Sequence, residues 1–284
     1  MNQKVLCFGE VLWDAFGDGK KAGGAPMNVA WHLKQQGADV QFASSLGKDA
    51  SGDELFAFLE KSDLDSPLIQ RDELPTCEVT VQLDANQHAT YIIPEPVSWD
   101  NIRATSELKK AAANASAIIF GSLACRGKRT RETLVGLLDD TSKMRVFDVN
   151  LRAPHYNLDT IQTLAAKSSF IKMNDDEAEL LIRGRGDLKS KIIEFQKAYH
   201  PKTVCVTRGD KGALLFHNDE FYEHAGYPAN VVDTVGAGDS FLATLVVGLL
   251  SNNDPNEVLD RACKVGAFVA GQRGATPVYP KDLV

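Results

Sequence analysis

Several signals that would assign a location or a cofactor are missing from this 284-residue sequence. No run approaches the ~20 apolar residues that a membrane helix needs. The N-terminus also lacks the basic stretch and the apolar stretch of a secretory signal. The five cysteines form no Cys-x-x-Cys pair and lie near no regularly spaced histidines, which disfavours a disulfide framework or a metal site. We therefore expect buried thiols, a cytoplasmic protein and no membrane partner.

The chain also contains fewer basic than acidic residues. Lys and Arg number 31 against 38 Asp and Glu, giving a net charge of −7, which disfavours nucleic acid and anionic membranes as partners. An apolar fraction of 44% and a charged fraction of 24% are ordinary for a globular protein. The length fits one large α/β domain over residues 1–284. An anionic ligand would have to be held by a few local groups.

The two common nucleotide-binding motifs are absent. A P-loop needs Gly-Lys-Ser/Thr, which occurs nowhere in the chain, and the dinucleotide fingerprint needs a third glycine where Phe241 stands. The chain has instead a Gly-Ala-Gly-Asp turn at 236–239, followed by an apolar run through Leu250. Because that run is apolar nearly all round a helix, it predicts a buried helix opened by a glycine turn.

The turn at 236–239 suits anion binding and base catalysis. The first backbone N–H groups of a helix have no partner within it and lie at the positive end of the helix dipole, so they bind phosphate and other anions. Asp239 falls in this first turn, where its carboxylate is stabilised and can take a proton from a hydroxyl while the attacked phosphoryl group is held. The plainer alternative is a tight turn with Asp239 as a helix cap.

The string Asp-Thr-Val-Gly-Ala-Gly-Asp at 233–239 favours the chemical interpretation. It resembles the second signature of the ribokinase-like (PfkB-type) carbohydrate kinases, whose pattern is Asp-Thr-x-Gly-Ala-Gly-Asp. The resemblance implies that Asp239 is the base that activates the sugar hydroxyl. It also implies that the transferred phosphoryl group is held by Gly236, Ala237 and Gly238.

A second glycine pair opens another predicted helix at 23–30, with the sequence Gly-Gly-Ala-Pro-Met-Asn-Val-Ala. Taken alone, this is a turn with a proline at the start of a helix. It resembles the first signature of the same family, in which Gly-Gly-x-x-x-Asn contacts the sugar. By that resemblance, the substrate-binding group is Asp14, Gly23, Gly24 and Asn28.

Strands and helices alternate through much of the chain. Helices are predicted over 26–36 and 50–61, and short apolar runs, each followed by a helical pattern, lie at 117–120, 145–147, 170–173 and 203–206. This alternation implies parallel strand pairing with right-handed crossovers. We expect a three-layer α/β/α ribokinase-like sandwich with a mostly parallel central sheet, whose ligands lie beyond the strand C-terminal ends.

Polar residues follow the last three of these strands. Taken alone they are strand-end caps, and Asn174 with Glu177 is also a capping box. They resemble the family's Asp-x-Asn-x-Arg, Asn-x-x-Glu and Thr-x-Gly stretches, which implies ATP and Mg²⁺ as cofactors. By that resemblance, the ATP-binding residues are Asn150, Arg152, Asn174, Thr207 and Gly209. Asn174 and Glu177 would act through the hydrated Mg²⁺, and Asp233 would lie at a monovalent cation, K⁺.

The segment 76–93 interrupts the alternation. Its apolar residues recur at every second position and return after a turn at 84–87, which predicts a two-stranded hairpin with one apolar face. A hairpin cannot bury that face alone, so it covers either the site or a partner subunit. Relatives carry a small β-sheet lid that often dimerises. The resemblance therefore implies lid segments near 12–22 and 76–98 and a homodimer through the lid.

The resemblance spans nearly the whole chain and implies an ATP-dependent sugar kinase that transfers the γ-phosphoryl group to a primary hydroxyl. The first signature and Asn-Leu-Arg at 150–152 look most like fructokinases, so the expected reaction converts fructose to fructose 6-phosphate. Within the family, 2-keto-3-deoxygluconate kinase and ribokinase are the alternatives. From other classes, the intact Asp239 and Glu177 disfavour a catalytically silent sugar-binding regulator. The missing third glycine disfavours an oxidoreductase.

Overall fold

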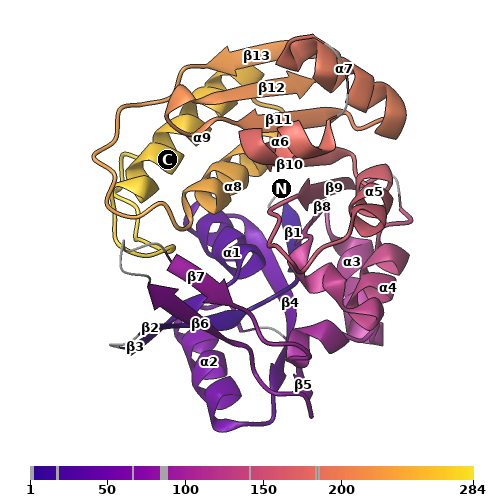
Figure 1. The fold of residues 1–284 in the computed structure, drawn as a ribbon, viewed down its shortest axis with the longest axis vertical. Coiled ribbons are helices and arrows are strands. Elements are labelled where there is room, and N and C mark those ends of the chain that lie inside the picture. The colour runs from indigo at the N-terminus through magenta and orange to yellow at the C-terminus, as the bar shows by residue number, and fades with distance from the viewer. Residues whose placement is uncertain are drawn as a thin grey trace.

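The computed structural model describes residues 3–16, 19–65, 67–83, 89–140, 142–182, 184 and 186–284. The larger sheet within these residues contains β1 (Lys4–Phe8), β4 (Asp39–Gly47), β5 (Ile69–Asp72), β8 (Ala117–Gly121), β9 (Met144–Asp148), β10 (Phe170–Asn174), β11 (Thr203–Thr207), β12 (Ala213–His217) and β13 (Glu220–His224). Their order across the sheet is β13-β12-β11-β10-β9-β8-β1-β4-β5, as Figure 1 shows.

Helices cover both faces of this sheet. Alternate residues of β1 belong to two separate core clusters, Leu6 and Phe8 to one and Val5 and Cys7 to the other. The first cluster is completed by α3 (Ser106–Asn114), α4 (Lys128–Leu137), α5 (Leu158–Ala166), α6 (Asp175–Leu181) and α7 (Leu188–Tyr199). The second is completed by α1 (Ala25–Gln35), α2 (Ala50–Lys61), α8 (Ala237–Leu250) and α9 (Pro255–Ala270). The predicted three-layer sandwich is therefore confirmed.

Across the sheet, neighbouring strands pair in parallel from the edge strand β5 as far as β11. The part of the sheet beyond β11 differs from the sequence prediction. The helical pattern expected after 203–206 is wrong, because a short 3-10 turn leads instead into the antiparallel strands β12 and β13. Gly212 makes that turn possible, since its φ is 76° and a Cβ there would lie 2.0 Å from the carbonyl oxygen of His224. The run 213–216 is buried throughout and is therefore a strand of the core.

The smaller sheet consists of β2 (Leu12–Phe16), β3 (Gly19–Gly23), β6 (Glu78–Leu83) and β7 (Ala89–Ile92), in the order β3-β2-β6-β7. Antiparallel pairing of β6 with β7 confirms the predicted hairpin, while its turn at 84–87 lies outside the described residues. β2 pairs antiparallel with β3 and parallel with β6. Two segments that are distant in the sequence thus form one sheet, separate from the main one.

Contacts with α2 hold the β2–β3 side of the small sheet, which lies above α2 in Figure 1. The indole N–H of Trp13 donates to the carbonyl oxygen of Ser51 at 3.1 Å. The Trp13 ring meets that of Phe58 edge-on, with 6.3 Å between centroids. Lys20 Nζ lies 2.5 Å from a carboxylate oxygen of Glu54. One face of the β2–β3 hairpin is therefore packed against the body of the protein.

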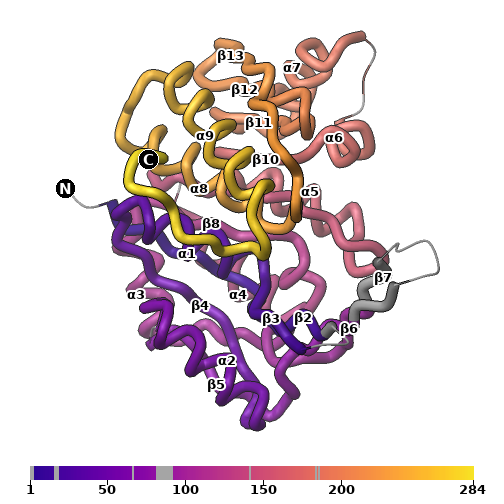
Figure 2. The backbone as a smooth tube through the Cα atoms, turned by 90° about the vertical axis from the view of Figure 1, so that its left-hand side faces the viewer, coloured from indigo at the N-terminus to yellow at the C-terminus, as the bar shows by residue number. Residues whose placement is uncertain are grey.

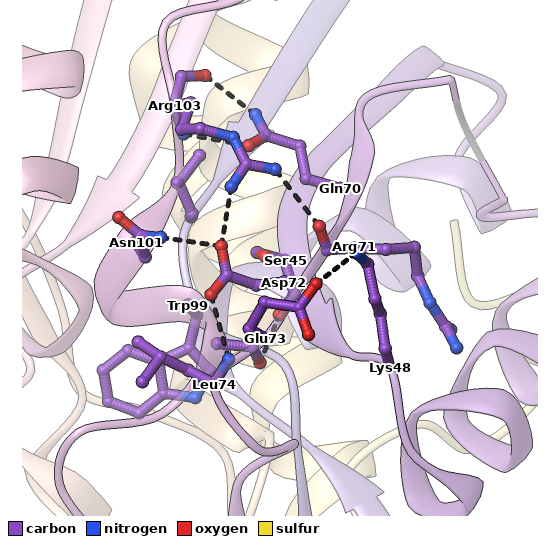
Figure 3. Close-up of polar contacts among 12 residues, drawn as sticks. Ser45, Lys48, Gln70, Arg71, Asp72, Glu73, Leu74, Trp99, Asn101 and Arg103 are labelled. Atoms are coloured by element: carbon purple, nitrogen blue, oxygen red, sulfur yellow. Dashed lines mark hydrogen bonds and ion pairs between the residues drawn. The ribbon is translucent and has the colours of Figure 1, made fainter.

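A buried carboxylate anchors the chain where it returns from the small sheet (Figure 3). Asp72 Oδ2 accepts hydrogen bonds from Asn101 Nδ2 at 2.6 Å and from Arg103 Nη1 at 2.7 Å. Its Oδ1 accepts from the Leu74 amide at 3.0 Å. Burial would raise the pKa of Asp72, but these hydrogen bonds outweigh burial and lower it. The segment 98–103 is thus fixed to the end of β5.

None of the helices in the described part of the chain is long and apolar enough to cross a membrane. The five cysteines are free and buried, as the sequence predicts.

Candidate active site

α8 begins at the predicted glycine turn. Its N-cap, Gly236, has a φ of 81°, and a Cβ there would lie 2.3 Å from the carbonyl oxygen of Ala275, so only glycine fits. No side chain caps the helix, and the amides of Gly238 and Asp239 have no hydrogen-bond partner among the described residues. The helix is buried along most of its length, as predicted. The turn therefore presents free N–H groups at the positive end of a buried helix.

The two glycine-opened helices meet at a hydrogen bond between residues 211 positions apart: Asn28 Nδ2 donates to Asp239 Oδ2 at 2.8 Å. α1 begins after Gly24, with proline in its first turn, which places Asn28 one turn into the helix. Asn28 is buried, and its Oδ1 has no partner within the described residues. The carboxylate of Asp239 is therefore held by a side chain of α1 and is not a helix cap.

The surroundings of Asp239 adjust its affinity for protons. Burial raises its pKa to about 6, and the charge of Asp148 adds to that rise. The hydrogen bond from Asn28 and the charges of Lys172 and Arg152 act in the opposite direction. At neutral pH the carboxylate is ionised yet more basic than an ordinary aspartate, which are the two properties that a general base needs.

The predicted substrate residues lie on the side of the site that faces the small sheet. A Cβ on Gly23 would lie 2.6 Å from Asp14 Oδ2, and a Cβ on Gly24, whose φ is 114°, would lie 2.6 Å from the carbonyl oxygen of Glu10. Gly24 therefore requires glycine, whereas a side chain at Gly23 would push the Asp14 carboxylate out of its place. Burial raises the pKa of Asp14, while the charge of Arg152 lowers it. Asp14 thus lies within the electrostatic reach of a residue that also acts on the base.

A buried lysine that the sequence prediction missed lies beside the glycine turn. Lys172 Nζ is 3.0 Å from Asp148 Oδ1, and both side chains are buried. A Cβ on Gly238 would lie 3.2 Å from the same ammonium group. Burial disfavours the charged form, but the carboxylates of Asp148 and Asp239 outweigh it and raise the pKa of Lys172. The signal was a lysine inside the apolar strand run 170–173, where no solvated face accounts for it.

Glu10 is a second buried group outside the predicted set. It follows β1, is 2% exposed, and its Oε2 has no partner among the described residues. Burial raises its pKa to about 7; Arg152 lowers that pKa, whereas Asp239 and Asp148 raise it. The site thus gathers three carboxylates that repel one another, and Lys172 and Arg152 are cations that offset them.

Glu177 ties together the ends of β9 and β10. Its Oε1 accepts from the Leu151 amide at 2.7 Å, and its Oε2 accepts from the Asn174 amide at 2.9 Å. Asn174 Oδ1 in turn accepts from the Glu177 amide at 2.8 Å, so the predicted capping box is confirmed. Each carboxylate oxygen of Glu177 thus accepts one backbone amide and keeps a second lone pair for a further donor.

The remaining predicted nucleotide residues lie along the same edge of the sheet. Asn150 follows β9 in a left-handed conformation with a φ of 38°, and Arg152, two residues further on, is exposed. Thr207 ends β11 opposite Asn174 of β10. Gly209 follows it with a φ of 58°. The structure therefore places these five residues after three adjacent strands.

Asp233 lies before α8 and contacts the C-terminal segment, which we define as residues 273–279. Its Oδ1 accepts from the Val235 amide at 3.0 Å and its Oδ2 from the Gly274 amide at 3.1 Å. Among the side chains that the structure describes, no group of three or more His, Cys, Asp or Glu is placed to hold a metal ion.

An α/β sandwich with free helix amides and a carboxylate at one sheet edge has the groups that phosphoryl transfer requires. The profile of the pfkB family carbohydrate kinases matches residues 2–282, so the chain belongs to that family. A fructokinase of Salmonella typhimurium is 28% identical, and the match covers 100% of this chain and 99% of the relative.

Solved structures agree. The crystal structure of a fructokinase with bound ATP from Xylella fastidiosa has a TM-score of 0.86 at 21% identity, over 99% of this chain and 96% of that one. That of an uncharacterized sugar kinase from Pyrococcus horikoshii in complex with ATP has a TM-score of 0.79 at 26% identity, over 96% and 94%. The fold and the family that the two signatures predicted are thereby confirmed.

Proposed function

We propose that the protein is an ATP-dependent sugar kinase that transfers the γ-phosphoryl group of ATP to the 6-hydroxyl of fructose. The observation that carries this proposal is Asp239: it is bonded to Asn28 on the sugar side, and its own helix turn presents free amides on the phosphate side. A base and an anion hole that share one turn can act on the two ends of the bond being formed.

In this mechanism the acceptor hydroxyl gives its proton to the carboxylate of Asp239 as its oxygen bonds to the γ-phosphorus. The bond from that phosphorus to the β-phosphate oxygen breaks, and ADP leaves with its electron pair. The free amides of Gly238 and Asp239 in this turn receive the transferred group, and Lys172 stands beside it as a fixed buried cation. The charge that develops is thus met by dipoles that need little rearrangement.

The donor set fits a magnesium nucleotide whose metal is held mainly by phosphates and water. The Glu177 oxygens are oriented by backbone amides and each keeps a lone pair, so this residue, with Asn174, would orient water around Mg²⁺. When bound, Mg²⁺ neutralises the phosphate charge. The nucleotide would lie along Asn150, Arg152, Asn174, Thr207 and Gly209. Asp233, beside the C-terminal segment, would lie at a K⁺ site.

Fructose is proposed over 2-keto-3-deoxygluconate because of the charges around the acceptor. The acceptors on that side include the carboxylate of Asp14, the amide oxygen of Asn28 and the buried Glu10, with Arg152 as the cation that acts on both carboxyl groups. Hydroxyl groups donate to such acceptors, whereas a substrate carboxylate would be repelled by them. The fructokinases among the relatives support the same acceptor.

We also propose the domain organisation, the oligomeric state and the cellular location. Residues 1–284 would form one kinase domain, with the small sheet as a lid built from segments near 12–22 and 76–98. A homodimer through that lid would use the outer strand β7, where Ile92 is 48% exposed. Free buried thiols support a reducing, cytoplasmic location.

The substrate is tested by measuring ADP release with fructose, ribose, tagatose, adenosine and 2-keto-3-deoxygluconate. We expect the highest kcat/KM with fructose and a product phosphorylated at O6. A higher value with 2-keto-3-deoxygluconate would reject fructose and leave the kinase assignment intact. ADP release with none of them would favour a sugar-binding regulator.

The base is tested by Asp239→Asn, which preserves size and can still accept from Asn28. We expect kcat to fall by roughly two to four orders of magnitude, with little change in sugar or ATP affinity, because the proton matters only in the transfer step. If the variant keeps more than about a tenth of the wild-type kcat, the mechanism fails.

A further inference from the structure

The imidazole of His32 is fully buried on α1, one turn beyond Asn28. Its Nε2 lies 2.9 Å from the carbonyl oxygen of Ala275, and its Nδ1 lies 2.6 Å from the hydroxyl oxygen of Tyr279. The two rings stack at an angle of 16° with 5.4 Å between centroids. Both ring nitrogens are therefore engaged by the C-terminal segment, which runs beside α1 in Figure 2.

Only one arrangement of protons satisfies these contacts. A carbonyl oxygen can only accept, so the proton of the neutral imidazole must be on Nε2. Nδ1 is then an acceptor, and the Tyr279 hydroxyl donates to it. Burial lowers the pKa of His32 to about 4 despite the opposing effect of the Ala275 carbonyl, and burial raises the pKa of Tyr279. At neutral pH the order is Tyr279 to His32 to Ala275.

The carbonyl that His32 binds lies directly behind the anion-binding turn. A Cβ on Gly236 would be 2.3 Å from that oxygen and 2.6 Å from the Cα of Ala275. No space remains between the segment and the turn, so a shift of one displaces the other. The Gly274 amide adds a second link through Asp233.

α1 reaches the catalytic turn by two routes. Asn28 bonds the carboxylate of Asp239 directly, while His32 acts through Ala275 and Gly236. Gln35 strengthens the second route, since its Nε2 donates to Pro277 O and its Oε1 accepts from the Tyr279 amide, both at 2.9 Å. The helix that carries the proposed sugar-binding residue thus also fixes the position of the amides that would bind phosphate.

We propose that His32 is a positioning residue for phosphoryl transfer. By donating a hydrogen bond from Nε2 to the carbonyl oxygen of Ala275, it holds the amides of the turn at 236–238 in position relative to the sugar hydroxyl that contacts Asp239. This inference rests on the proposed kinase function. Small errors in such a register affect the transition state far more than substrate binding. The role should therefore appear in kcat and not in KM.

The test removes a single hydroxyl. Tyr279→Phe keeps the ring that stacks on His32 but removes the hydroxyl that donates to Nδ1, so the imidazole loses one of its two anchors while the Ala275 carbonyl still requires the Nε2–H tautomer. We expect kcat to fall at least about tenfold, with the KM values for sugar and ATP within roughly twofold. In ¹H–¹⁵N spectra of the imidazoles, His32 should be the Nε2–H tautomer in both proteins, and its Nε2–H signal should shift or broaden in the variant because the ring is held less firmly.

Two variants at His32 complete the test. His32→Gln offers an amide that can donate to Ala275 and should recover part of kcat, whereas His32→Leu cannot donate and should not. Tyr222→Phe removes a hydroxyl that bonds Glu220 on an exposed edge strand at 2.6 Å and should leave kcat unchanged. Because kcat is compared among folded variants, a loss of stability alone does not imitate the expected order.

Unchanged kcat in Tyr279→Phe and His32→Leu overturns the inference, as does an increase in KM without a change in kcat. An unperturbed His32 Nε2–H signal in Tyr279→Phe, together with a lower kcat, also overturns it, because the effect then bypasses His32. A wild-type protein that phosphorylates no acceptor overturns the proposed function and this inference together. An active wild type with indifferent variants overturns this inference alone.

Discussion

At the residue scale, burial and charge act on Asp239 in opposite directions, and their balance predicts a pH profile. Because the pKa of this carboxyl group is about 6 and only its ionised form can accept a proton, kcat/KM should be level above that pH and decline below it. The decline should approach tenfold per pH unit. Initial rates between about pH 5 and pH 8 under the coupled assay check this.

Glu10 provides the matched control, because burial raises its pKa to about 7. Glu10→Gln removes this second titrating group and should leave the limb near pH 6 in place. If the limb disappears in Glu10→Gln, the group that controls the rate is Glu10 and the assignment of the base is wrong.

The residues of the site divide by how far away their partners lie. Asn28 and Asp239 could be predicted because each belongs to a local string in which glycines and a helix start fix the geometry. Lys172 and Glu10 could not be predicted in this way. Lys172 pairs with Asp148, 24 positions away on the neighbouring strand, so its role follows from strand pairing and not from any local pattern.

At the element scale, the Lys172–Asp148 pair joins β9 and β10 inside the sandwich. Lys172→Met should lower the free energy of unfolding by about 3–5 kcal/mol, because it leaves a buried carboxylate without its cation. Adding Asp148→Asn to that variant should recover much of the loss, since the uncompensated charge is then gone. Urea unfolding of both variants and the wild type measures the difference.

An exposed pair shows what burial contributes. Lys197 Nζ lies 3.0 Å from Glu194 Oε1, and the two side chains are 64% and 59% exposed. Lys197→Met should therefore cost less than about 1 kcal/mol. Equal losses of unfolding free energy in Lys172→Met and Lys197→Met would mean that burial does not strengthen the dependence of Asp148 on its cation.

Elements with regular periodicity and clear ends were predictable to within a residue or so. The helix predicted over 50–61 is α2, and that predicted over 26–36 is α1, shifted by one position. β12 was missed because a short buried strand and a buried helix share the same apolar composition. β13, the edge strand, was missed because it is largely exposed and lacks an apolar run. Gly212 was the local clue to the turn, but the close approach that requires glycine there comes from His224, which is distant in sequence.

At the scale of the whole molecule, the small sheet is fastened to α2 at its β2–β3 side and has β7 as its outermost strand on the other. Trp13 and Lys20 attach the β2–β3 side to α2, and Asp72 fixes the returning segment 98–103. β7 pairs with β6 alone at the opposite edge. The sequence predicted the hairpin from its alternation, but attachment to α2 depends on contacts across some forty positions, which no local pattern contains.

This attachment predicts that the small sheet closes by bending and not by turning as a rigid body. In amide hydrogen exchange, β7 should exchange faster than β8 and β11, which lie inside the main sheet. Adding sugar with a non-hydrolysable nucleotide should slow exchange in β7, since closure covers it. The amides of β2 near Trp13 should change little, because α2 already holds them. Uniform slowing across β2 and β7 would show that the sheet moves as one body, and no response in either would contradict its proposed role as a lid.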